Sequence, residues 1–172
     1  VYLEGGANPN FEPKIGLGGA TRNTFSRNTT TGRGGHMFFA QGAQGSIDSV
    51  DMDQGSAGPS GGSIHISSDA TPTFSDCQIG DSSAIDGGVI SILDGQPTFN
   101  GGSHLYTGTA SNVGGIVWIS GEDAILNCSA AELYDGSAVR GCIVAVINEA
   151  NCVWSDVQMS DGIATTNGGG LY

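Results

Sequence analysis

A Gly-Gly pair, or a remnant of one, recurs at nearly equal intervals along the whole chain. The intervals are 27, 26, 27, 27 and 27 residues. A unit of this length with only short apolar stretches cannot bury them alone, so neighbouring units must stack to share a core. The repeat therefore favours a solenoid. The pairs begin at Gly34, Gly61, Gly87, Gly114, Gly141 and Gly168.

Each unit contains three short stretches with the spacing of β-strands. The first has two apolar positions: Met37/Phe39, Ile64/Ile66, Ile90/Ile92, Val117/Ile119 and Val144/Val146, with Val1/Leu3 and Leu171 in the same frame. The second centres on Ile47, Phe74, Phe99, Leu126 and Trp154. The third centres on Phe25, Met52, Ile79, Leu105, Leu133 and Met159, and is followed by a small residue: Thr30, Ala57, Ala84, Ala110, Ala138 or Ala164.

No stretch with a helical period interrupts this pattern. Strands that pair in parallel with their copies about 4.8 Å along an axis predict an all-β fold, a right-handed parallel β-helix of about six coils of 26–27 residues with three strands per coil. A β-sandwich is the main alternative, but its strands need not recur in register. Phe11 and Phe25 are 14 residues apart, whereas Phe74 and Ile79 are 5 apart. Residues 12–22 are therefore predicted to contain an inserted loop.

The repeating unit reads GG-x-I-x-I, then P-T-F-x-x-C, then I-x-x-S-x-A-x-x-GG. It resembles the right-handed parallel β-helix repeat proteins, especially the polymorphic outer-membrane-protein type, which is marked by GGAI and FxxN tetrapeptides. Here these are GGVI at residues 87–90 and FSRN at residues 25–28, while later units mostly have Gly or Ser at the Asn position. The resemblance covers nearly the whole chain. It implies a fold rather than one function, because such repeats occur in adhesins, autotransporter passengers, cell-wall proteins and fibres.

The formal net charge is -12, and residues 34–172 hold a single basic residue, Arg140. Such a surface repels phosphate backbones, so nucleic acid is not expected as a partner. The longest apolar run, residues 142–147, is too short to span a membrane. No signal peptide is visible, and a start at Val1 is typical of a processed or excerpted segment.

Residues 1–172 are expected to form a single β-helix segment. Leu171-Tyr172 has the coil phase of Val1-Tyr2, and neither end shows a polar cap. An uncapped β-helix leaves open strand edges. We therefore expect the segment to belong to a longer solenoid or to stack end to end with copies of itself.

The outward face of the first strand is predicted to be unusually apolar. Contiguous exposed apolar patches mark interfaces, and the interface candidates are Val89, Ile116, Ile143, Tyr2, Trp118 and Tyr172, with Phe38 and Ala145 beside them. His36 and His65 are expected on the surface of the same sheet. Alternatively, the loop at residues 12–22 or a flanking segment covers this face.

Acidic residues recur at the turn after the first strand: Glu4, Asp69, Asp94, Glu122, Asp123 and Glu149. Carboxylates stacked about 5 Å apart repel one another unless they are screened or bridged. Calcium could bridge them, which makes Asp69, Asp94, Glu122, Asp123 and Glu149 the candidate ligands. The sequence lacks a nonapeptide calcium repeat, so a solvated acidic edge is favoured, and no other cofactor is expected.

Catalysis is not expected, and no catalytic residue is assigned. The resemblance implies that a β-helix polysaccharide lyase would need a basic residue beside calcium-binding acids, and Arg140 lies alone at a turn. Asp76, Asp81, Asp94 and Asp123 could supply the carboxylate pair of a glycosidase, but turns of acidic proteins produce such pairs freely. Ice binding would use ranks of Thr-x-Thr, but residues 71–73 and 107–109 fall at different coil phases.

The four cysteines, Cys77, Cys128, Cys142 and Cys152, fall at four coil phases. Pairing between adjacent coils needs matching phase, so few or no disulfides are expected, with Cys77 facing inward and Cys142 in place of a turn glycine. No CxxC is present, which makes a zinc site improbable. Asn28 and Asn127 begin glycosylation sequons at predicted surface turns.

These features predict a secreted or cell-surface module with a structural or adhesive role. It would be a fibre subunit or a section of an adhesin that assembles through the open ends of its helix. Glycans or other surface proteins are further candidate partners. An ice-binding protein and a polysaccharide-acting enzyme stay open as alternatives.

Overall fold

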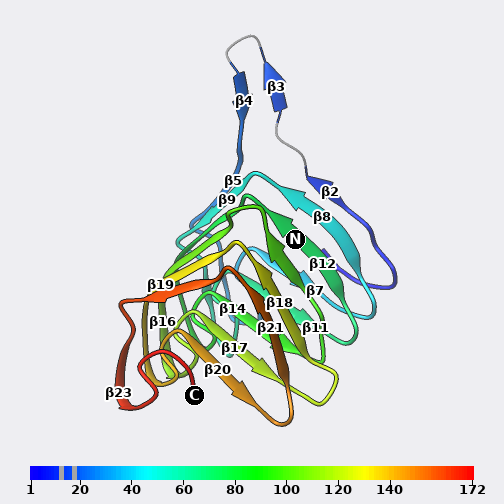
Figure 1. Ribbon diagram of the computed structural model, residues 1–172. Coiled ribbons are helices and arrows are strands. Elements are labelled where there is room, and N and C mark those ends of the chain that lie inside the picture. Colours follow the sequence, from blue (N-terminus) through cyan, green and yellow to red (C-terminus); the bar gives the residue numbers. More distant parts are fainter. Residues whose placement is uncertain (12–13, 17–18) are drawn as a thin grey trace.

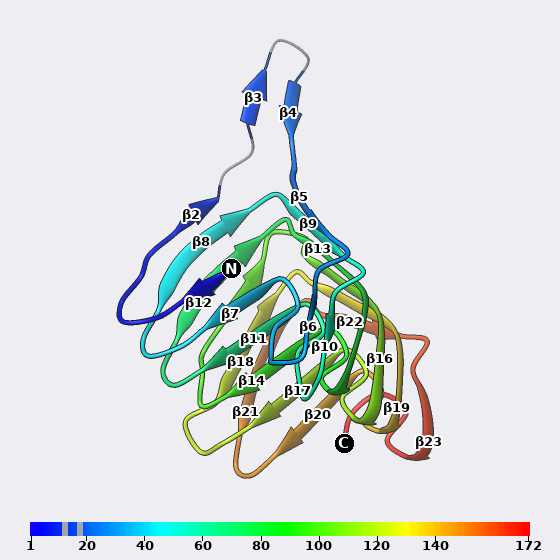
Figure 2. The ribbon, with the colours of Figure 1, turned by 180° about the vertical axis from the view of Figure 1, so that it is seen from behind.

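The chain folds into a parallel β-solenoid of about five turns (Figures 1 and 2). The computed structural model describes residues 1–11, 14–16 and 19–172. Every regular element in these residues is a β-strand, which confirms the predicted all-β parallel β-helix, with about five turns where about six coils were predicted. Within the same residues, no helix has the length and apolarity needed to cross a membrane.

Three sheets form the walls of the solenoid. The first contains β1 (Tyr2–Leu3), β7 (Met37–Phe39), β11 (Ile64–Ser67), β14 (Ile90–Leu93), β17 (Val117–Ser120) and β20 (Val144–Ile147). The second contains β2 (Asn10–Phe11), β8 (Gln44–Asp48), β12 (Thr71–Ser75), β15 (Thr98–Asn100), β18 (Ile125–Ser129) and β21 (Asn151–Ser155). The third contains β5 (Asn23–Ser26), β6 (Thr29–Thr30), β9 (Val50–Asp53), β10 (Ser56–Ala57), β13 (Gln78–Asp86), β16 (His104–Val113), β19 (Glu132–Arg140), β22 (Gln158–Ser160) and β23 (Ile163–Asn167).

The predicted ladders of the first and third sheets are confirmed. Ile64 pairs with Ile90 and Ile66 with Ile92, and in the third sheet Ile79 pairs with Leu105. These side chains are fully buried. Like residues one coil apart therefore build the core, as the repeat requires.

The predicted ladder of the second sheet is wrong at one position. Phe99 pairs with Cys128 rather than with Leu126. The turn before this strand is longer than in the preceding coil, since Cys128 lies 9 residues after Ile119 whereas Phe99 lies 7 after Ile92. Leu126 is nevertheless fully buried, because it lies two residues before Cys128 on the same face.

The described strands of the predicted insertion at residues 12–22 project from the coil, as expected, between β2 and β5 (Figure 1). Its described part is a two-stranded antiparallel hairpin, β3 (Lys14–Gly16) with β4 (Gly19–Thr21); residues 12–13 and 17–18 lie outside the described residues. At its base the Arg22 guanidinium donates to Oδ1 of Asp51 at 2.5 Å and to Oδ2 of Asp76 at 2.9 Å. The hairpin is thus attached at the corner between the second and third sheets.

Candidate functional site

The residue that follows each glycine pair points into the core. Val89, Ile116 and Ile143 are at most 1% exposed and belong to the hydrophobic core. Their prediction as an outward interface column is therefore wrong. The left-handed backbone at Gly87 (φ 60°) turns the chain, so that Val89 and the next residue, Ile90, are both buried.

The side chains of these inward residues contact a second column of residues. That column consists of the positions equivalent to Asn28, the fourth residue of the FxxN motif, and each inward residue contacts the member that belongs to the next coil. A Cβ built at Gly108 would lie 2.7 Å from Cγ2 of Val89, and one at Gly162 would lie 3.0 Å from Cγ1 of Ile143. His36 likewise faces Gly55, and Ile116 faces Gly136. Large residues after a glycine pair therefore face glycine in the next coil.

Ser63 follows a glycine pair but is smaller than His36, Val89, Ile116 and Ile143, and it has a different partner. The Ser63 hydroxyl lies 2.7 Å from the hydroxyl of Ser82 in the next coil. A serine, not a glycine, thus faces the small residue. The two columns complement each other in size, which close packing requires. We call these two columns the corner pair: one holds the residues after the glycine pairs, and the other holds the residues at the fourth position of the FxxN motif.

The corner pair begins with a buried histidine. His36 is 2% exposed, and its Nδ1 accepts a hydrogen bond of 2.8 Å from Nδ2 of Asn28. Burial lowers the pKa of His36. Its prediction as a surface residue is wrong, because it takes the position that Val89 holds two coils later.

The outward column of the first sheet is shielded by its own aromatic rings. Tyr2 stacks on Phe38 at 5.1 Å between centroids, and Phe38 lies 4.8 Å from His65. His65 is 0% exposed, so its prediction as a surface residue is also wrong. Nδ1 of His65 lies 2.6 Å from the Ser91 hydroxyl, and burial lowers the pKa of His65 to about 3.

Three of the six interface candidates are therefore buried, and Trp118 is half-buried. Tyr2 and Tyr172 are 62% and 41% exposed, and they lie on the first and last coils. Ala145, next to them in the predicted patch, is fully buried. The exposed part of the predicted interface is thus confined to the ends of the solenoid.

Both ends leave the core open. Leu3, Phe11 and Phe25 are the first-coil members of ladders that are fully buried in the middle coils. These three side chains are themselves only half-buried. In the last coil, Met159 and Leu171 are 37% and 58% exposed. The outermost strands of the sheets, among them β1, β2, β21 and β22, each have one unpaired edge.

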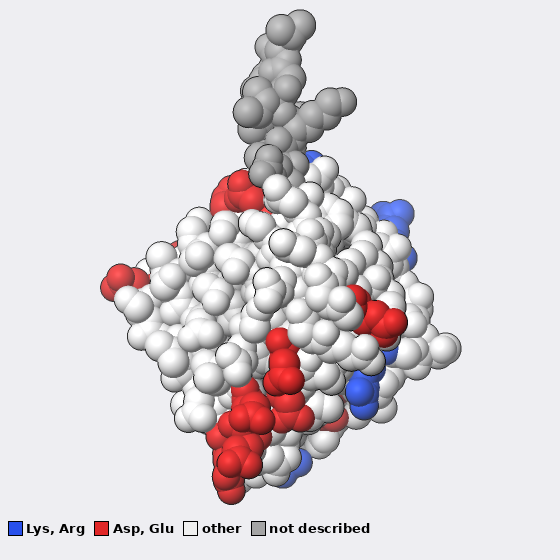
Figure 3. Space-filling view, turned by 90° about the vertical axis from the view of Figure 1, so that its right-hand side faces the viewer, with Lys and Arg blue, Asp and Glu red and all other residues white. Residues whose placement is uncertain are grey.

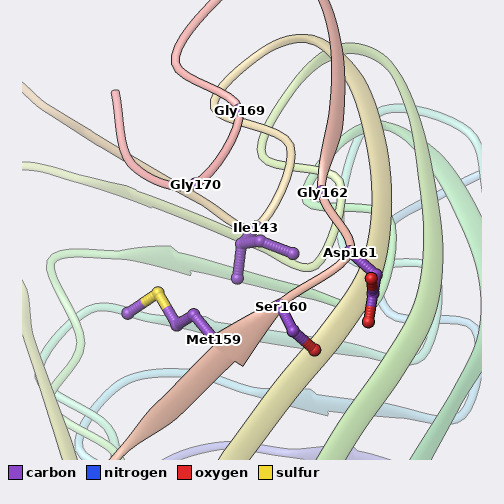
Figure 4. Close-up of a pocket in the computed structure, with 7 residues that line it drawn as sticks. All are labelled: Ile143, Met159, Ser160, Asp161, Gly162, Gly169 and Gly170. Atoms are coloured by element: carbon purple, nitrogen blue, oxygen red, sulfur yellow. The ribbon is translucent and has the colours of Figure 1, made fainter.

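The last coil also contains a cavity of about 220 Å³ (Figure 4). Ile143, Gly162, Gly169 and Gly170 line one part, and residues 159–161 line the rest. Gly170 follows its glycine pair as Ile143 does, so it belongs to the corner pair. Gly170 has no side chain, and the cavity lies where a side chain at this position of the corner pair would be.

The acidic turns after the first sheet form one edge of the solenoid. Figure 3 views this side and shows acidic side chains gathered mainly on its lower part. In the described residues no group of three His, Cys, Asp or Glu side chains could hold a metal ion. Asp69, Asp94, Glu122, Asp123 and Glu149 are thus not brought together as a calcium site, and Glu122, Asp123 and Glu149 are solvent-exposed.

The two sequons differ in their settings. Asn28 is exposed and lies between β5 and β6, at a turn as predicted. Asn127 lies inside β18 and is half-buried, so its prediction at a turn is wrong. The longer turn before β18 shifts it into the strand.

Cys77 is fully buried and faces inward, as predicted, and the four cysteines are present as free thiols. Thr71-x-Thr73 lies in β12 and Thr107-x-Thr109 in β16, in different sheets. Thr73 does pair with Thr98, but Ser46 and Asn127 continue that column. The threonine pairs therefore form no extended rank.

These features define a parallel β-solenoid with a packed core and two open ends. Comparison with protein-family models, with curated proteins and with solved structures gave no significant match. The functional argument therefore rests on the geometry of the solenoid.

Proposed function

We propose that the chain is a structural module of a secreted or cell-surface assembly, and that it associates end to end through its first and last coils. The observation that carries the proposal is the open core at both ends. Leu3, Phe11 and Phe25 at one end and Met159 and Leu171 at the other continue ladders that are fully buried in between. Covering them removes apolar surface from water, which is favourable.

The unpaired strand edges support the same proposal. An exposed edge is a template for pairing with another chain unless Pro, Lys or a bulge blocks it. The last strands, β21, β22 and β23, contain no Pro or Lys, and β21 and β22 pair without a register shift, whereas β23 pairs with β19 with one. A copy that binds with its first coil on the last coil of another makes a head-to-tail contact, which builds a filament when it does not close into a ring.

The likeness of the repeat to polymorphic outer-membrane-protein repeats supports a place outside the cell. In such a setting the module would act as a fibre subunit or as a section of an adhesin. Surface glycans or other surface proteins would then contact the long outer walls, while the ends hold neighbouring modules.

The test is the assembly state of the purified 172-residue chain. We expect sedimentation velocity to show species that grow with protein concentration, and electron microscopy to show rods with an axial repeat of about 29 Å, from six strand layers of about 4.8 Å. A sharp monomer at high concentration would overturn the proposal.

Two variants separate end contacts from side contacts. Met159→Lys places a charge on the open end and should abolish association. Ile163→Lys is the matched control, because Ile163 is 69% exposed and pairs with Ser137, an outward-facing position. Circular dichroism should report the same β content for both variants.

A further inference from the structure

We infer that the two ends meet in one register, in which Arg27-Asn28 of one copy lies against Asp161-Gly162 of another. This rests on the proposed end-to-end association and specifies its contact. Arg27 and Asp161 lie in one column of the solenoid, defined by charge, and Asn28 and Gly162 lie in the next column, defined by size.

The column defined by charge lies in the third sheet, at the bend between its first and second strand segments, such as β5 and β6 in the first coil. Its residues share a left-handed backbone, with φ between 44° and 59°: Arg27, Gln54, Asp81, Thr107, Asp135 and Asp161. Arg27 is exposed and donates to Oε1 of Gln54 in the next coil at 3.0 Å. Asp161, at the other end, is exposed as well. A second copy stacked on the last coil therefore brings Arg27 to the position after Asp161.

The neighbouring corner column repeats this polarity. Strand pairing aligns Thr24, Asp51, Gln78, His104, Glu132 and Gln158. The residues two positions before these, with Arg22 at one end and Asp156 at the other, therefore share a column. Arg22 is paired with two carboxylates of its own chain, Asp51 and Asp76, whereas Arg27 donates to the uncharged Gln54, so we assign the direct contact to Arg27.

Overall charge supports a head-to-tail contact. Residues 1–33 contain four basic and two acidic residues, whereas residues 147–172 contain three acidic residues and no basic one. Opposite charges on two facing surfaces steer association and set its register, whereas like charges suppress it. Contacts between two first coils or two last coils would bring like charges together.

The size argument comes from the corner pair. Each residue after a glycine pair faces the FxxN position of the next coil, and large residues face glycine. Gly170 reverses the pattern, because it is the smallest residue of its column and leaves the 220 Å³ cavity beside Gly162 (Figure 4). The next FxxN position, in a second copy, is Asn28, the largest residue of its own column. The cavity is thus placed to receive the side chain of Asn28, which would give up its hydrogen bond to His36 of its own copy to enter it.

One local adjustment accompanies this register. Leu171 pairs with Val144, and Val146 donates to the carbonyl of Tyr172. These residues occupy the columns that Val1 and Tyr2 of a second copy would enter. Either Leu171-Tyr172 or Val1-Tyr2 therefore leaves the first-sheet edge when two copies stack.

Charge reversal tests the first column. Asp161→Arg should raise the dissociation constant of the assembly at least about tenfold, and Arg27→Asp should do the same. The double variant Asp161→Arg with Arg27→Asp should restore association. Asp135→Arg is the matched control, since Asp135 is exposed in the same column but one coil away from the end, and it should leave association unchanged.

Size exchange tests the second column. A Cβ at Gly170 meets nothing within 4 Å, so Gly170→Ile should fold normally, fill the cavity and weaken association. Adding Asn28→Gly should restore it, because this recreates the Ile143–Gly162 arrangement at the junction. Thermal unfolding of each variant as a monomer checks that the fold is intact.

A covalent readout locates the contact directly. Arg27→Lys keeps the charge and supplies an amine that a zero-length carbodiimide couples to Asp161 of the neighbouring copy, which peptide mass spectrometry detects. Arg33→Lys is the control and should give no link to Asp161. If the wild type assembles but neither charge exchange, size exchange nor coupling behaves as stated, this register is wrong while the proposed function stands. If the wild type never assembles, both fail.

Discussion

The rings of Phe74 and Phe99 lie face to face one coil apart, with centroids 4.7 Å apart and planes inclined by 6°. Phe39 and Phe74 form an edge-to-face pair with ring centroids 6.0 Å apart. All three side chains are fully buried. Stacked and edge-to-face pairs stabilise a core beyond the burial of their area, so these rings join the first and second sheets.

Replacement of Phe99 should be among the most destabilising changes in the chain. Phe99→Ala should lower the free energy of unfolding by about 3–5 kcal/mol, because it creates a cavity and removes a stacked ring. Phe99→Leu should cost less, since it keeps most of the apolar volume. Urea unfolding followed by circular dichroism measures both, with Thr98→Ala as the outward-facing control. Equal losses for Thr98→Ala and Phe99→Ala would contradict the assignment of Phe99 to the core.

A methyl group should not fit at the second glycine of a pair. A Cβ at Gly88 would lie 2.3 Å from the carbonyl oxygen of Gly115 and 2.5 Å from the amide nitrogen of Thr109. Gly88→Ala should therefore shift the backbone of two coils and cost about 1–3 kcal/mol. Gly32→Ala is the control, because its Cβ would meet only the Thr30 hydroxyl, at 3.4 Å. Thermal unfolding should show a lower melting temperature for Gly88→Ala than for Gly32→Ala.

Stability should fall as the pH drops below neutrality. Burial lowers the pKa of His65 to about 3, whereas an unfolded histidine titrates near about 6.5. Between these values the unfolded chain takes up a proton that the folded chain does not, so unfolding becomes easier as the pH falls. The loss from His65 approaches about 1.4 kcal/mol per pH unit below about 6.5, and the lowered pKa of His36 acts in the same direction.

Urea unfolding between pH 7 and pH 5 tests this prediction. His65→Gln should flatten the dependence, although it also lowers stability at pH 7 through lost packing against Phe38. His104→Gln, at a half-buried position beside Glu132, is the matched histidine replacement. A wild-type stability that is constant over this range would show that His65 is accessible to protons in the folded state.

The buried thiols should resist alkylation until the chain unfolds. Burial raises the pKa of Cys77 to about 11 and that of Cys128 to about 12. The thiolate is the reactive form, so iodoacetamide at pH 8 should modify neither residue in the folded protein. Mass spectrometry after a short pulse should show both modified in guanidinium chloride. Modification of Cys128 at equal rates in the two conditions would place it at the surface.

The ladders were predictable because strand spacing repeats from coil to coil. Ile64, Ile90 and Val117 align as their sequence positions indicate. The prediction failed at Leu126 because the preceding turn is longer, and turn length is free to vary where the chain leaves the core. A periodic sequence therefore predicts strands more reliably than the register of a single coil.

The directions of the Val89 and His36 side chains were not predictable from the spacing of the sequence. Strict alternation places a residue outside when its neighbour is inside, but the left-handed glycine before it turns the backbone at the corner, so two successive side chains enter the core. His65 was misplaced for a different reason: it does point away from the core, and the ring of Phe38 covers it.

The corner pair makes the coils non-interchangeable. Removal of residues 117–143 would set Ile116 against Gly162, a combination the solenoid already contains. Removal of residues 37–63 would set His36 against Ser82. The imidazole ring, which now faces Gly55, would then meet a side chain. Lengthening or shortening such a chain by whole units is therefore tolerated at some junctions and not at others, and a change on one side of a junction constrains the residue on the other.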